Sequence, residues 1–155
     1  MNKKLFDEHV AKFEQLQKLF EAQPDEYRFE LASKCFALGF VCNQSKKFDE
    51  ADKYYTLALE NYRVLNAESN HKYDDMIASI CYSLALVKRL SQGSRATAEK
   101  LYLEALGIYI SKSHTDPAKY SPLASKTAKK LSVIYKEKSI EYRMLSDKMK
   151  ASQSE

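Results

Sequence analysis

The side chains most often used in catalysis and metal binding are few in this sequence and lie far apart. His9, His71 and His114 are scattered, with no partner at the spacing of a metal ligand, and no C-x-x-C pair occurs. The three glycines are too dispersed to form a Gly-rich phosphate-binding loop, and neither H-E-x-x-H nor G-x-S-x-G is present. The sequence therefore predicts a protein that is not an enzyme and that uses no metal and no cofactor.

Two other groups of residues have structural explanations. Asp74 and Asp75 stand at the start of a helical pattern, where carboxylates complement the positive end of the helix dipole. Cys35, Cys42 and Cys81 are an odd number, in a chain whose basic first residues are not followed by the apolar segment of an export signal. We expect these cysteines to be small apolar residues between helices and not a disulfide framework.

Composition favours one helical domain over residues 1–155. The chain is 45% hydrophobic and 30% charged, which is ordinary for a globular protein. It contains only three Gly and three Pro and no Trp, which favours helices. The longest apolar run, residues 35–42, is too short to cross a bilayer. We therefore expect a cytoplasmic protein that does not associate with membranes.

An internal repeat organises the chain. Six residues recur at a constant offset of 47: Ala51, Lys53, Tyr55, Ala58, Leu59 and Tyr62 return as Ala98, Lys100, Tyr102, Ala105, Leu106 and Tyr109. A Tyr followed eleven residues later by a Leu occurs three times at offsets of 46 and 47, as Tyr27 and Leu38, Tyr73 and Leu84, and Tyr120 and Leu131. Three units of 46–47 residues explain both patterns.

Each unit predicts two helices. Apolar residues fall at i, i+4, i+7 and i+11 in both helices of the first unit, as Leu31, Cys35, Leu38 and Cys42 and then as Ala51, Tyr55, Ala58 and Tyr62. Alternating Ala and Tyr let neighbouring helices approach closely while the rings fill the gaps between them. Polar breaks follow the first helices at residues 43–47 and 91–95, where Ser94 is suited to cap a helix.

The units predict an order of segments along the chain: a leading helix at 3–22, a first repeat at 24–68, a second at 70–112, and a divergent third repeat or C-terminal helix at 117–150. Nothing from residue 123 onward is Gly or Pro. Residues 123–150 therefore form either one long helix or two helices with a break near residues 138–139.

These units resemble tetratricopeptide repeats. Residues 37–59 contain the family's pattern, with Leu38-Gly39, the turn aromatic Phe48, and then Ala51, Tyr55 and Ala58-Leu59. Residues 83–106 repeat it with one inserted residue and without the turn aromatic. The period exceeds the usual ~34 residues and is similar to that of kinesin light chains. Over about residues 24–137, the resemblance implies an all-α, right-handed superhelix, a solenoid of stacked antiparallel helix pairs with about 3 to 3.5 repeats and roughly seven helices.

The resemblance also implies a concave groove, lined by the first helix of each unit, that holds a peptide or a partner's helix. The stripe expected to face this groove runs from aromatic to basic: Phe36, Phe40 and Asn43, then Tyr82, Leu86 and Arg89, then Lys126, Lys129, Val133 and Lys136. Two alternatives stay open. Phe36 and Phe40 could be core beneath residues 3–22, and the lysines could be an ordinary solvated surface.

We thus predict an adaptor, scaffold or chaperone-like module that binds a protein or peptide partner. Residues 1–111 carry a net charge of −1 and residues 112–155 a net charge of +5. The alternative is therefore nucleic-acid or acidic-partner binding through the basic C-terminal third, although Glu137, Glu141 and Asp147 interrupt that surface and disfavour nucleic acid. One continuous C-terminal helix would leave Tyr135, Tyr142, Leu145 and Met149 uncovered, which would favour a homodimer through this helix.

Overall fold

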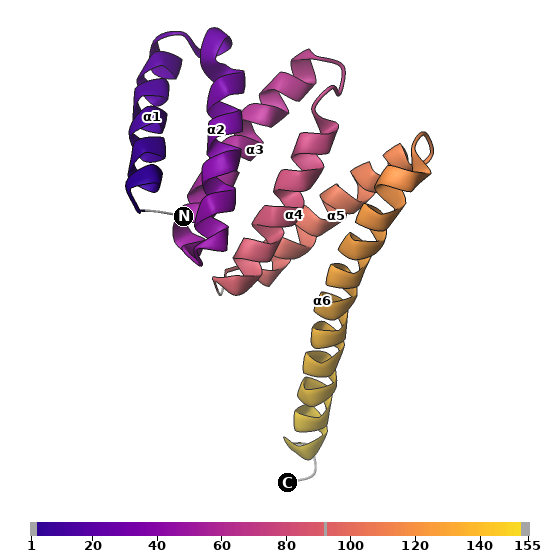
Figure 1. Cartoon of the computed structure of the whole chain (residues 1–155). Helices are drawn as coiled ribbons and strands as arrows, with labels where there is room; N and C mark the ends of the chain where they lie inside the picture. Colours follow the sequence, from indigo (N-terminus) through magenta and orange to yellow (C-terminus); the bar gives the residue numbers. More distant parts are fainter. Residues whose placement is uncertain (1–2, 92, 153–155) are drawn as a thin grey trace.

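The computed structural model describes residues 3–91 and 93–152 (Figure 1). These residues form six helices and no strand, which confirms the all-α prediction. The helices are α1 (Lys3–Ala22), α2 (Pro24–Gln44), α3 (Phe48–Glu68), α4 (Asp74–Leu90), α5 (Arg95–Ser113) and α6 (Pro117–Ser152). The described residues contain six helices, whereas the repeat predicts about seven. The difference arises because residues 123–150 all belong to the single helix α6 and are not divided into two helices.

Each helix packs against the one before it, and α2 also contacts α4. In Figure 1, α2, α4 and α6 follow one another across the molecule, with α3 and α5 behind them. Phe13 of α1 meets the ring of Tyr54 of α3 edge-on, with ring centroids 5.3 Å apart. None of the described helices combines the length and the apolar character needed to cross a membrane.

Local sequence explains several helix starts. Pro24 stands in the first turn of α2, where the missing N–H of proline costs no helical hydrogen bond. Asp74 and Asp75 occupy the first turn of α4, as the sequence predicts. Ser94 caps α5 as predicted, because its Oγ accepts a hydrogen bond of 3.2 Å from the N–H of Thr97.

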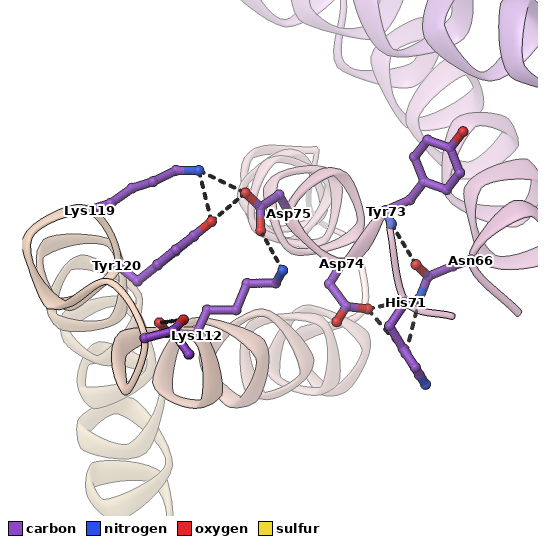
Figure 2. Close-up of polar contacts among 9 residues, drawn as sticks. Asn66, His71, Tyr73, Asp74, Asp75, Lys112, Lys119 and Tyr120 are labelled. Carbon is purple, nitrogen blue, oxygen red and sulfur yellow. Dashed lines mark hydrogen bonds and ion pairs between the residues drawn. The ribbon is translucent and has the colours of Figure 1, made fainter. Parts of the chain in front are cut away.

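The connection between α3 and α4 is held by the buried amide of Asn66 (Figure 2). Its Oδ1 accepts a hydrogen bond of 2.7 Å from the N–H of Tyr73, and its Nδ2 donates one of 2.8 Å to Asp74 Oδ1. Asn70 and His71 between them have positive φ angles of 50° and 64°. Asn66 thereby satisfies the backbone of a tight left-handed turn and fixes where α4 begins.

The residues copied between units form the centre of the core. Tyr55 and Tyr102 are both 0% exposed, and each ring meets an aromatic residue of the preceding helix. Phe36 lies 5.9 Å from Tyr55 between ring centroids, and Tyr82 lies 5.5 Å from Tyr102. The two copied tyrosines therefore have closely similar surroundings, which is the physical reason for the repeated letters.

Helix α6 is much longer than the helix that it packs against. Its 36 residues extend about 54 Å, whereas the 19 residues of α5 extend about 28 Å. Tyr120, Thr127, Leu131 and Ile134 are buried, but every described side chain from 139 to 145 is exposed. Figure 1 shows this part of α6 running past the ends of α4 and α5. Tyr142 is 70% exposed, the side chain of Met149 lies outside the described part of the chain, and the homodimer stays a prediction.

Candidate interaction surface

Buried groups offer no reactive centre in the part of the chain that the structure describes. No three His, Cys, Asp or Glu side chains among these residues are grouped as a metal site. All three cysteines are buried and free, and burial raises the pKa of the Cys35 and Cys81 thiols to about 12. These thiols are protonated at neutral pH and therefore poor nucleophiles.

The predicted stripe on α2 divides between core and surface. Phe36 is half-buried and packs on Tyr55, so it belongs mainly to the core. Phe40, one turn later, is 53% exposed, and Asn43 is half-buried. Of the two phenylalanines, Phe40 is the one whose ring is accessible to a partner.

The stripe on α4 is partly engaged within the chain. Tyr82 is half-buried and its ring packs on that of Tyr102 with an interplanar angle of 67°. Leu86, one turn later on α4, is also half-buried. Arg89 donates from both terminal nitrogens to the two carboxylate oxygens of Glu137 on α6, at 3.0 and 2.8 Å. These hydrogen bonds lower the pKa of Glu137. Arg89 therefore positions α6, and its guanidinium is occupied before any partner arrives.

The stripe on α6 supplies positive charge. Lys126 lies with its Nζ 5.0 Å from the centroid of the Tyr82 ring, which joins α6 to α4 by a cation–π contact. Lys129, Val133 and Lys136 are exposed. The ammonium groups of Lys126, Lys129 and Lys136 all lie more than 4.0 Å from every carboxylate that the structure describes. We call the accessible set the inner face: Phe40, Tyr82, Leu86, Lys126, Lys129, Val133 and Lys136.

Two polar networks orient α6 and thereby the inner face. The first network lies near the start of α6. There Tyr120 and Lys119 of α6 donate hydrogen bonds of 2.6 and 2.9 Å to Asp75 of α4, and Asp75 also pairs with Lys112 of α5 at 3.1 Å (Figure 2). Near its middle, α6 forms three ion pairs with α4 and α5: Glu137 with Arg89, Lys138 with Glu99, and Glu141 with Arg95. The lysines of α6 are therefore held at a fixed angle to α4.

Comparison of the chain with protein-family models, with curated proteins and with solved structures finds no match. The chemistry of the surface is what remains to indicate a function.

Sequence reasoning missed the contacts that orient α6. Arg89 and Glu137 are 48 residues apart, Arg95 and Glu141 are 46 apart, and Asp75 contacts Tyr120 45 residues later. These separations are close to the repeat period, so opposite charges about one period apart are the signal that identifies them. Glu137 and Glu141, which interrupt the basic sequence, form ion pairs with Arg89 and Arg95. Their negative charges are therefore not available to neutralise the exposed lysines of the inner face.

The Asp75 network predicts a pH dependence of stability. Burial alone would raise the pKa of Asp75, but hydrogen bonds from Tyr120, Lys119 and Lys112 outweigh it and hold that pKa at about 2. Since the folded pKa is depressed below 3.8, the carboxylate contributes stability above that pH, and the contribution is lost as the pH falls through about 2. Because the side chain is 37% exposed, we expect Asp75→Asn to cost roughly 1 kcal/mol at neutral pH.

Urea unfolding followed by circular dichroism at a series of pH values measures this effect. The difference between wild type and Asp75→Asn should shrink as the solution is acidified from about pH 4 to about pH 2. Asp25→Asn is the matched control, because the Asp25 carboxylate is fully exposed and its contact with Arg28 is long, at 3.9 Å. This change should therefore have little effect on stability. A constant difference between wild type and Asp75→Asn across the acid range would contradict the assignment.

Proposed function

We propose that the protein is an adaptor or scaffold module, built as a tetratricopeptide-like superhelix, that binds an acidic amphipathic segment of a partner protein. The observation that carries this proposal is the chemistry of the inner face. It combines Lys129 and Lys136, exposed and without an acidic partner among the described residues, with the apolar groups of Phe40, Leu86 and Val133. An apolar anchor with a charged rim is the usual composition of a helix-binding or peptide-binding groove.

One feature supports a protein partner over a nucleic acid. The positive charge lies beside the aliphatic side chains of Leu86 and Val133, which neither pair with phosphates nor stack on bases as aromatic rings do. The ion pairs that fix α6 against α4 and α5 lower the ordering cost of binding for either class of partner.

The test uses a fluorescein-labelled amphipathic helix with a Leu/Phe face and a Glu face, and a second helix in which every Glu is Gln. We expect the Glu helix to bind and the double variant Phe40→Asp/Lys129→Glu to weaken it at least about tenfold, or about 1.4 kcal/mol, in fluorescence anisotropy. The matched control is Leu103→Asp/Lys100→Glu, which makes the same kinds of change at exposed positions of α5.

The same assay separates the alternatives. Binding to a single-stranded oligonucleotide that is tighter than to the Glu helix and that weakens steeply with salt would favour nucleic acid. Equal weakening by the α2/α6 variant and by the α5 control, or equal binding of the Glu and Gln helices, would refute the proposed inner face.

A further inference from the structure

A groove lies between α1 and α2. It has a volume of about 180 Å³ and is lined by His9, Lys34, Ala37, Leu38 and Val41. Leu38 is buried at 2% exposure, while Ala37 is exposed and Val41 is half-buried. The groove thus has an apolar wall contributed by one helix and a basic end where the two helices meet.

Among the described side chains, the positive charge at the basic end has no counter-charge. Lys34 Nζ lies 2.8 Å from Nδ1 of His9. Because a protonated lysine has donors only, Lys34 donates this hydrogen bond and Nδ1 of the imidazole accepts it. Burial lowers the pKa of Lys34, and the nearby positive charge of Lys12 lowers it further. An ammonium group and an imidazole therefore meet at this end of the groove, and the positive charge of Lys12 is close enough to act on Lys34.

No carboxylate of the described side chains forms an ion pair with Lys34, Lys12 or His9. Three acidic side chains near these groups in the sequence, those of Glu8, Glu14 and Glu30, are exposed. A partly desolvated ammonium gains more from a carboxylate than a fully hydrated one does, since the local dielectric is lower. The charge of this groove is complementary to an anion.

The dimensions and the lining restrict what that anion can be. Sites for whole small molecules are commonly ~300–1,000 Å³, so a groove of about 180 Å³ suits one or two side chains. Ala37, Leu38 and Val41 would contribute nothing to the binding of a free inorganic anion. They fit an aliphatic side chain that is attached to the same ligand as the negative charge.

We propose that this groove binds a segment of another protein that places an aliphatic side chain against Ala37, Leu38 and Val41 and a carboxylate against Lys34. The groove is separate from the lysines of α6, which lie on the far side of α4 from it. The inference therefore goes beyond the inner face and does not require that the inner face bind anything.

Short capped peptides test the groove directly. The probes are Ac-Leu-Glu-Leu-Glu-NH2, its Gln counterpart Ac-Leu-Gln-Leu-Gln-NH2, its Ala counterpart Ac-Ala-Glu-Ala-Glu-NH2, and inorganic phosphate. Each is titrated into isotopically labelled full-length protein while the amide signals of Ala37 and Val41 and the ring signals of His9 are followed by NMR. We expect saturable shifts with the Leu/Glu peptide and at least fivefold weaker binding of the Gln and Ala peptides.

Three variants at two positions assign the effect to Lys34. Lys34→Met keeps the aliphatic stem and removes the charge, so it should weaken the Leu/Glu peptide at least fivefold, while Lys34→Arg should retain binding. Lys100→Met, at an exposed lysine of α5, should change nothing. The inference is overturned if Lys34→Met binds as tightly as wild type, if the Glu and Gln peptides bind equally, or if no signal of the groove moves.

Two further outcomes are distinguishable. If phosphate alone shifts the NMR signals as much as the Leu/Glu peptide does, the groove is a simple anion site and the proposed peptide binding is wrong. The Lys129→Glu variant, changed only on α6, should leave the groove titration unchanged, so failure of the inner face and failure of the groove are separate results.

Discussion

Tyr55→Ala and Tyr102→Ala should each lower the free energy of unfolding by about 3–5 kcal/mol, the usual cost of removing a fully buried aromatic ring. Both rings are 0% exposed, and each packs against an aromatic residue of the preceding helix. Alanine leaves a cavity between two rigid helices, which can collapse only in part. Urea unfolding followed by circular dichroism measures both losses, and the two should agree within about 1 kcal/mol because the surroundings match.

A conservative change at one of these positions, Tyr102, separates packing from hydrogen bonding. The hydroxyl of Tyr102 is buried without a hydrogen-bond partner among the described residues. Tyr102→Phe therefore removes a polar atom that gains nothing from folding, and stability should stay within about 1 kcal/mol of wild type. Leu103→Ala, one residue away but 46% exposed, is the surface control. Tolerance of alanine at one tyrosine but not at the other would show that the two helix pairs are packed differently.

Glycine-to-alanine changes should have opposite signs at two helical positions. A Cβ on Gly39 of α2 would lie 2.7 Å from Cδ1 of Tyr55, and that ring is fully buried and cannot move aside. We expect Gly39→Ala to cost about 1–3 kcal/mol through overpacking, even though alanine favours a helix over glycine by about 1 kcal/mol. A Cβ on Gly107 of α5 would meet nothing within 4 Å. Gly107→Ala should therefore stabilise the protein by about 0.5–1 kcal/mol.

Thermal and urea unfolding of the two alanine variants provide the measurement, with each glycine serving as the control for the other. The contrast isolates the close approach of α2 and α3, because helix propensity favours alanine at both positions. Stabilisation by Gly39→Ala would mean that α2 and α3 are farther apart than the structure places them. Destabilisation by Gly107→Ala would show that this position of α5 is not open to solvent.

Local sequence was sufficient for most helix boundaries. The polar breaks at residues 43–47 and 91–95 coincide with the ends of α2 and α4, and Ser94 caps α5 as its position predicts. Local sequence did not predict the length of α6, because it left open whether residues 123–150 form one helix or two. Nothing after Leu123 interrupts a helix, but a helix can also end where its neighbours end, and this depends on tertiary packing that one sequence does not display.

The candidate site was predictable in outline and not in detail. Spacing alone places Phe36 and Phe40 on similar sides of α2, yet Phe36 covers Tyr55 while Phe40 is exposed. The difference arises from where Tyr55 of α3 lies against α2. The engagement of Arg89 by Glu137 likewise depends on where α6 lies beside α4. The contact of Lys34 with His9 has no sequence signal, since it joins residues 25 apart on helices from different units.

The part of α6 beyond its last described ion pair would act as a lever on the residues that hold the helix. Its last ion pair with the rest of the described chain is at Glu141, and the remaining 11 residues to Ser152 reach about 16 Å farther. A rotation of about 10° at that pivot would swing the tip by about 3 Å, so a small adjustment among the ion pairs of α4 and α5 would be magnified at a distance. A molecule gripping the tip would, conversely, exert torque on Arg89, Glu99 and Arg95, and through Arg89 on the helix that carries Tyr82 and Leu86.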